Sequence, residues 1–190
     1  MKKTMLSLMG LFLALAVSAQ TKVSTATTWN FADKQNGEVL ADKTVDMNGL
    51  YLRGGADKHV ITAKKSNCKL TLADGTHFVA KMGAYCGGNQ FWKSLKPTTS
   101  VSQDNAKFDR CFAVETAVPG TLQIIAAPKG GLEGKERVAK LYCNGQEVFS
   151  RSFDEKGAFE VICDAKEAGK FFFGANGGFF VYQVKFTPAQ

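Results

Sequence analysis

The sequence contains few of the residues and motifs from which catalytic sites are built. It has only two histidines in 190 residues. His77 is expected at a packed or edge position of a strand and His59 at the start of one, so neither is predicted to act as a catalytic base. The sequence also lacks a GxSxG nucleophile elbow, an HExxH zinc motif and a phosphate-binding Gly-Lys-Ser/Thr loop. These absences exclude the most recognisable hydrolase and nucleotide-binding sites.

Charge of one sign is not concentrated anywhere in the sequence. The formal net charge is +7, yet acidic and basic residues are scattered, and Lys64-Lys65 is the longest basic run after the first residues. Proteins that bind nucleic acid usually gather lysine and arginine on one face. We therefore predict no nucleic-acid partner. The mild basicity would suit an acidic glycan, but a mixed solvated surface is the favoured explanation.

The N-terminus has the three parts of a secretory signal peptide. A basic start is followed by the apolar run Met5–Val17 and by the small-residue exit Ser18-Ala19. We predict cleavage after Ala19 and export to the periplasm, the cell surface or the medium. The apolar run is shorter than the roughly 20 residues that span a bilayer. No membrane span is therefore expected after cleavage.

The odd number of cysteines excludes complete pairing within one chain; the five are Cys68, Cys86, Cys111, Cys143 and Cys163. Their spacing matches neither a zinc motif nor a small disulfide scaffold. Cys68 and Cys163 alternate with apolar residues of predicted strands, which is typical of buried, inert thiols. Cys86 lies in a glycine-rich stretch and is predicted to be the most exposed. One disulfide is compatible with export, and its pairing stays open.

Short runs rich in Val, Ile, Phe, Tyr and Thr recur throughout residues 20–190 and predict strands with little helix. Asp74-Gly75 and Asn144-Gly145 favour two-residue hairpin turns, which need positive φ angles. Pro119-Gly120 fits a type II turn, and Ala175–Gly178 forms a fourth turn. No internal repeat or linker is evident. We therefore predict one domain over residues 20–190, an all-β, antiparallel β-sandwich of jelly-roll-like form.

The turns also predict which side chains share a face. If Asn144 and Gly145 are the loop residues, Leu141 lies opposite Val148 on a buried face. Phe149 then belongs to the opposite, outward face. The closing strand is expected to alternate cleanly, with one face carrying Phe180, Tyr182, Val184 and Phe186.

Carboxylates are present, but the sequence does not pair them for catalysis. Glycoside hydrolysis needs two carboxyl groups roughly 5–10 Å apart. Glu115 and Glu160 lie on predicted strands that nothing ties together, so we predict no enzymatic activity. Oxygen ligands for calcium could come from Asp46 with Asn48 or from Asp104-Asn105, but neither set matches an EF-hand loop. No metal or cofactor is predicted, with a structural calcium ion as the alternative.

The longest irregular stretch, Gly83–Ala106, carries the most specific functional signal. Three aromatic residues fall within eight positions of it, and flat aromatic rings pack against the CH faces of sugars while nearby amides bind the hydroxyls. The predicted ligand-binding residues are Trp92, Tyr85, Phe91, Asn89, Gln90 and, as a further polar candidate, Arg53. The alternative is that Trp92 folds back and caps one end of the sandwich. Trp29 is expected in the core.

Four segments together carry a family resemblance: Thr28–Phe31, Gly49–Gly55, Phe112–Leu122 and Gly177–Val184. They resemble a sandwich module of exported proteins of the Bacteroides–Prevotella group, often found attached to pectate-lyase-like enzymes. The resemblance spans most of residues 20–190, and its motifs are chiefly structural. It implies a jelly-roll-like fold and, by analogy, polysaccharide binding. The catalytic β-helix of such lyases is absent from this chain.

The sequence therefore predicts an exported, non-catalytic module that binds polysaccharide through loop aromatics. The alternative is a protein-interaction or structural envelope module without a glycan ligand. In that alternative the same aromatics lie in the core or face a partner chain.

Overall fold

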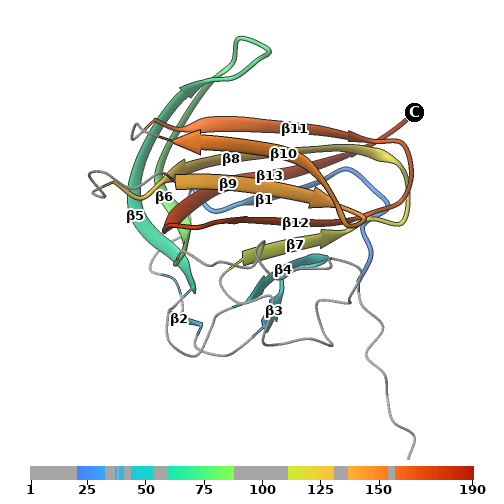
Figure 1. Cartoon of the computed structure of the whole chain (residues 1–190), viewed down its shortest axis with the longest axis horizontal. Coiled ribbons are helices and arrows are strands. Elements are labelled where there is room, and N and C mark those ends of the chain that lie inside the picture. Colours follow the sequence, from blue (N-terminus) through green and yellow to red (C-terminus); the bar gives the residue numbers. More distant parts are fainter. Residues whose placement is uncertain are drawn as a thin grey trace, which may run out of the picture.

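Two antiparallel sheets pack face to face in the computed structural model of the chain (Figure 1). The structure describes residues 21–32, 37, 39–40, 44–53, 60–87, 111–130, 137–153 and 157–190. Every regular element in these residues is a strand, which confirms the predicted all-β, jelly-roll-like sandwich. The predicted signal peptide, residues 1–19, lies outside the described residues. Within the described ranges, no helix has the length and apolarity needed to cross a membrane.

Each sheet mixes strands from distant parts of the chain. The first sheet contains, in spatial order, β11 (Phe159–Ala165), β8 (Gly120–Pro128), β13 (Phe179–Pro188), β6 (His77–Cys86), β5 (Val60–Thr71) and β2 (Val39–Leu40), and β1 (Thr27–Asn30) also pairs with β13. The second contains β10 (Gln146–Phe153), β9 (Arg137–Cys143), β12 (Lys170–Ala175), β7 (Cys111–Glu115), β4 (Leu50–Arg53) and β3 (Thr44–Asp46). From β7 onward the chain changes sheet at every connection except the β9–β10 hairpin.

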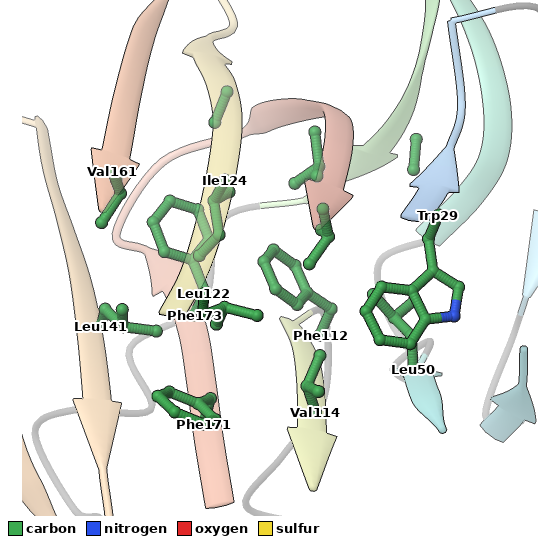
Figure 2. Close-up of a cluster of buried hydrophobic side chains, with 14 of the residues drawn as sticks. Trp29, Leu50, Phe112, Val114, Leu122, Ile124, Leu141, Val161, Phe171 and Phe173 are labelled. Carbon is green, nitrogen blue, oxygen red and sulfur yellow. The ribbon is translucent and has the colours of Figure 1, made fainter. Parts of the chain in front are cut away.

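The inward faces of both sheets meet in one apolar core (Figure 2). Because successive side chains of a strand point to opposite faces, β7 turns Phe112 inward and β12 turns Phe171 and Phe173 inward. The rings of Phe112 and Phe173 stack with centroids 5.2 Å apart. Trp29 lies in this core as predicted, and its indole N–H donates to the Met47 carbonyl oxygen at 2.6 Å.

A β-bulge at Tyr182 divides the closing strand, β13, into two halves. The register between β13 and β8 shifts at this residue, and the extra residue puts the alternation of side chains out of phase. Phe180 and Tyr182 therefore lie on the outer face of the first sheet, whereas Val184 and Phe186 lie in the main core. The predicted clean alternation, which placed all four residues on one face, is wrong.

The long β5–β6 hairpin covers part of the outer face of the first sheet (Figure 1). β6 pairs with β13 only through Ala84–Cys86, and β1 takes over the same edge of β13 after the bulge. Beyond that point Cys68 and Ala80 of the hairpin pack with the outward side chains of β8 and β13 in a second apolar cluster. At its tip, the N–H of Ala73 donates to the Glu160 carboxylate of β11 at 2.8 Å. The outer face of the first sheet therefore carries a second, smaller apolar core beneath the β5–β6 hairpin.

The Asn144-Gly145 turn has the predicted two-residue form. Both residues have positive φ, 48° and 90°, as a type I′ turn requires. A bulge in β10 then shifts the register, so that Leu141 pairs with Phe149 rather than with Val148. Phe149 packs against the main core and Val148 is 46% exposed. The faces predicted for these two residues are therefore reversed, because a slip of one residue exchanges the two faces of a strand.

The Asp74-Gly75 turn has a three-residue loop rather than the predicted two-residue one. The N–H of Leu72 donates to the Thr76 carbonyl oxygen at 2.8 Å, and Gly75 has φ 85°. The Asp74 carboxylate accepts the N–H of Thr76 at 2.8 Å and closes the loop locally. His77 is consequently an exposed residue at the hairpin edge, which agrees with the predicted packed or edge position.

Pro119-Gly120 connects the two sheets and does not form a hairpin. The preceding β7 belongs to the second sheet, and β8 begins at Gly120 in the first. Gly120 is not among the described glycines with positive φ, so the expected type II turn is wrong. Close packing explains the glycine instead, because an added Cβ would lie 2.4 Å from the Thr187 carbonyl oxygen and 2.6 Å from the Phe186 ring.

The described thiols confirm one prediction from the sequence and correct another. Cys68 is buried as expected, and burial raises its pKa to about 11. Cys86, predicted to be the most exposed, is fully buried in the main core, and burial raises its pKa to about 12. The reason is that β6 continues through Cys86 and pairs it with Phe179, where the glycine-rich sequence predicted a loop.

Gly120→Ala should lower the free energy of unfolding by about 1–3 kcal/mol, because the added methyl group must displace the backbone of β13. Gly157→Ala is the matched control, since nothing lies within 4 Å of a Cβ added there. The control should change stability by less than about 0.5 kcal/mol. Urea titrations measure both variants. Equal stability would contradict the close approach of β8 and β13.

Burial of Cys86 should weaken the fold at alkaline pH. Its folded-state pKa is raised from 9.0 to about 12, so its contribution is complete below pH 9 and is lost as the pH rises toward 12. The stability difference between wild type and Cys86→Ala should therefore shrink between about pH 8 and about pH 10.5, within the window that these pKa values define. Urea titrations across this range test it. A difference that stays constant would show that Cys86 ionises normally in the folded state.

Candidate functional site

The described residues form a pocket where β7 ends and β12 begins. Its volume is about 340 Å³, and its lining residues are Lys22, Glu115, Thr116, Asn144, Ala168, Gly169 and Lys170. These residues come from the segment before β1, the end of β7, the β9–β10 turn, the connection between β11 and β12, and the start of β12. We call this site the Glu115 pocket.

Main-chain hydrogen bonds hold the walls of the pocket in place. The N–H of Val23 donates to the Glu115 carbonyl oxygen at 2.8 Å, which brings Lys22 beside the end of β7. The N–H of Thr116 donates to the Gly169 carbonyl oxygen at 2.8 Å. In return, the N–H of Gly169 donates to the Thr116 hydroxyl oxygen at 2.9 Å. The pocket is therefore built on strand ends with satisfied backbone groups.

The amide of Asn144 is engaged within the protein. Its Oδ1 accepts the N–H of Lys170 at 2.9 Å, and its Nδ2 donates to the Ala168 carbonyl oxygen at 3.2 Å and to the Glu167 carboxylate at 3.3 Å. These bonds fasten the β9–β10 turn to the start of β12. Asn144 therefore shapes the wall, and the hydrogen-bonding capacity left for a ligand lies mainly with the charged side chains.

Glu115 is a buried carboxylate with only one oxygen partnered. Its side chain is 9% exposed, and Oε1 lies 3.2 Å from Lys22 Nζ and 3.9 Å from Lys170 Nζ. Oε2 is buried and has no hydrogen-bond partner. An unsatisfied buried polar atom costs about 1–3 kcal/mol, and more when it is charged. The stability of the fold therefore gives no reason for a carboxylate at this position.

The two lysines keep part of their surface in solvent. The Lys22 side chain is 56% exposed and that of Lys170 is 32% exposed. Ion pairs with this exposure contribute little to stability. The lining residues carry two ammonium groups and one carboxylate, a net positive charge, and the Glu167 carboxylate that accepts from Asn144 lies outside this lining.

Tyr85 is the predicted ligand residue whose side chain the structure describes. Its ring lies 5.3 Å from that of Phe180, centroid to centroid. Lys64 Nζ lies 4.7 Å and Lys129 Nζ 5.2 Å from the centroid of the Tyr85 ring. The ring is half-buried among an aromatic neighbour and two cations. Contacts within the protein thus occupy much of the surface that a stacked sugar would need.

The other predicted ligand residues are not brought to the Glu115 pocket by the part of the chain described. Asn89, Gln90, Phe91 and Trp92 lie outside the described residues. The backbone of Arg53 ends β4 in the second sheet and pairs with Cys111. Tyr85 belongs to the first sheet, so the backbone places these two candidates in different layers.

Asp46 has a role in a turn. Its carboxylate accepts the N–H of Gly49 at 2.8 Å and the Thr21 hydroxyl at 3.0 Å, while Asn48 takes a positive φ of 58°. Over the described ranges no group of three or more His, Cys, Asp or Glu side chains is arranged to hold a metal ion. The other set of calcium candidates, Asp104-Asn105, lies outside the described residues.

The Glu115 pocket was not predicted from the sequence. From the sequence, Glu115 is only a carboxylate on a predicted strand that nothing ties to a second carboxylate. The sequence does contain a local signal, because Glu115 directly follows the apolar residues Phe112–Val114. The structure shows that Glu115 is buried as well. Its neighbours Lys22 and Lys170 come from distant segments. The pairing of β7 with β12 sets Lys170 opposite Glu115, and the bridge between Val23 and Thr116 brings Lys22 beside them.

No protein-family model matches this chain, and no curated protein matches it in sequence. Among solved structures, the chain is similar to the CBM51 module of Clostridium perfringens GH95 in complex with methyl-galactose (8% identity, 85% of this chain, 100% of that chain, TM-score 0.39). It is also similar to the K1 cleaved adhesin domain of Lys-gingipain from Porphyromonas gingivalis W83 (8% identity, 88% of this chain, 100% of that chain, TM-score 0.45).

A third similar structure holds the CBM51-2 and INT domains of Clostridium perfringens ZmpB, with GlcNAc (6% identity, 86% of this chain, TM-score 0.40). The present chain spans 32% of its length. A likeness at these scores carries no argument about ligand sites. The resemblance to the Bacteroides–Prevotella module stays a prediction, because no family match tests it.

Glu115→Gln should leave the free energy of unfolding within about 1 kcal/mol of wild type or raise it, because it removes a buried charge while both lysines stay solvated. Thr116→Val is the comparison within the same pocket. It leaves the Gly169 N–H without its acceptor and should cost about 1–3 kcal/mol. Thermal and urea unfolding measure both variants. A loss of about 3–5 kcal/mol in Glu115→Gln would mean that the fold needs this ion pair.

Proposed function

We propose that this chain is an exported, non-catalytic module that binds a glycan in the Glu115 pocket. The observation that carries the proposal is the buried Glu115 Oε2, which has no partner and belongs to a residue lining a pocket. A side-chain movement that turns this acceptor toward a bound hydroxyl would satisfy it. The volume of about 340 Å³ lies within the range of small-molecule sites, roughly 300–1,000 Å³.

The polar groups of the pocket favour a ligand that is rich in hydroxyl groups. A hydroxyl both donates and accepts hydrogen bonds. Adjacent sugar hydroxyls can therefore donate to Glu115 and accept from the ammonium groups of Lys22 and Lys170 together. An apolar ligand would remove the water molecules that hydrogen-bond to these charged groups and would offer no hydrogen bonds in their place, which is unfavourable.

Binding without hydrolysis is supported by the number of carboxylates in the pocket. Glu115 is the one carboxylate among its described lining residues. Most glycosidases need two carboxyl groups, one as acid and one as base or nucleophile. The signal-like residues 1–19 support export, and the sequence resemblance to exported sandwich modules supports a polysaccharide as the ligand class.

A second contact through the predicted loop aromatics is part of the proposal, with Trp92 and Phe91 stacking on sugar rings and Asn89 and Gln90 binding hydroxyls. Of the other two predicted residues, Tyr85 in the first sheet would border this contact, whereas Arg53 lies in the second sheet. The two proposed contacts lie near opposite ends of β8. Tyr85 is paired through Phe180 with Ala127, toward the end of β8, whereas the Glu115 pocket adjoins the connection that leads into the start of β8. A long glycan chain could therefore meet the module at two separate places.

Affinity electrophoresis against a panel of plant and host polysaccharides tests the proposal. We expect retardation by at least one polymer, weakened by Glu115→Gln by about tenfold or more, because a charge-assisted hydrogen bond is lost. Glu147→Gln is the matched control, since Glu147 is an exposed carboxylate outside the pocket. Trp92→Ala reports on the loop contact separately.

Three outcomes would contradict parts of the proposal. Absence of retardation by every polymer would favour the protein-interaction or envelope module instead. Retardation that Trp92→Ala abolishes and Glu115→Gln leaves unchanged would place the glycan site at the loop alone. Release of products from any polymer by the purified protein would overturn the non-catalytic assignment.

A further inference from the structure

We infer that the Glu115 pocket selects an acidic sugar, a pyranoside whose carboxylate lies next to ring hydroxyl groups. The inference rests on the proposed glycan-binding function and names the ligand class of the same site. It is drawn from the charges that line the pocket and from the hydrogen bonds that they leave unmade.

The ammonium groups of Lys22 and Lys170 share a single oxygen atom. Both approach Glu115 Oε1, at 3.2 Å and 3.9 Å. Neither lysine has another carboxylate partner among the described residues. One negative charge therefore faces two positive ones, and the excess positive charge lies at the mouth of the pocket, where both side chains reach solvent.

The unused hydrogen-bonding groups of the pocket are of two kinds. Each ammonium has several N–H donors, of which the Glu115 oxygen can occupy only some. Oε2 of Glu115 is an acceptor without a donor. The complement is a ligand that presents an anionic acceptor to the lysines and a hydroxyl donor to Glu115.

Sugar acids combine these two groups within one ring. A carboxylate accepting from both lysines forms charge-assisted hydrogen bonds, which are about twice as strong as neutral ones. A ring hydroxyl beside it can donate to Glu115. A neutral sugar would satisfy Glu115 but would leave the excess positive charge unpaired. A free inorganic anion would pair with the lysines but could not donate to Oε2, and a cationic ligand would be repelled.

Isothermal titration calorimetry with the methyl glycosides of galacturonic and glucuronic acid, against those of galactose and glucose, tests this inference. We expect the acids to bind at least about tenfold more tightly at about 50 mM NaCl, and the preference to shrink at about 300 mM as salt screens the lysines. Lys170→Gln and Lys22→Gln should reduce binding of the acid to the level of the neutral sugar. Binding of the neutral sugars should fall much less, because the amide of the introduced glutamine can still donate to a hydroxyl.

Lys166→Gln is the matched control, because it removes the same charge from the connection before β12 at an exposed lysine outside the pocket. It should leave the preference for acids unchanged. Thermal unfolding checks that the lysine variants fold like wild type, as expected for partly exposed lysines.

The outcomes separate this inference from the proposed function. Equal binding of acidic and neutral sugars would overturn the inference and leave glycan binding intact. Retardation by polymers without any binding of the sugar acids would also overturn it. Competition by inorganic sulfate as strong as that of the sugar acid would show a plain anion site. Failure of every glycan in both experiments would overturn the proposed function itself.

Discussion

The extra residue at Tyr182 allows one strand to serve two partner strands and two apolar cores. Before the bulge, β13 pairs with β6, and after it the same edge pairs with β1. The Tyr182 ring turns outward into the second cluster, where its hydroxyl lies 2.8 Å from the Ser66 hydroxyl. Gly83 of β6 makes room for it, because an added Cβ would lie 2.9 Å from that ring. The pairing of β6 with β13 thus ends at the bulge, and beyond it the β5–β6 hairpin packs on the outer face of the sheet.

That covering decides where a ligand can reach polar groups on the described part of the protein. Phe180 and Tyr182 would offer aromatic surface on the outer face of the first sheet, but the hairpin buries both. Burial also raises the pKa of the Tyr182 hydroxyl. At the ends of strands β7 and β12, the Glu115 pocket combines ordered backbone with ammonium groups that reach solvent. A buried carboxylate with an unsatisfied oxygen is unfavourable for folding, and such positions are commonly retained for function.

Two bulges and one crossover account for the wrongly predicted side-chain faces and for the wrongly predicted Pro119-Gly120 turn. Val148 and Phe149 exchanged faces because the bulge in β10 inserts one residue into an otherwise regular pair. Pro119-Gly120 looked like a hairpin turn, since both neighbouring runs read as strands, yet those strands belong to different sheets. Gly120 is needed for contact with a strand that lies far along the chain. In each case, the contact that determines the structure joins segments that are not neighbours in the sequence, so the local residue pattern does not predict it.

Local chemistry determined a good part of this protein. The period-two patterns specified strands, the Asn144-Gly145 pair specified a type I′ turn through its two positive φ angles, and the apolar setting of Cys68 and Trp29 specified burial. Such features depend on a residue and its immediate neighbours, so the sequence displays them. The tertiary structure alone decided which strands share a sheet, where the bulges lie, and that Lys22, Glu115 and Lys170 meet. Those results depend on contacts between segments far apart in the chain, whose geometry exists only once distant strands have paired and the sheets have packed.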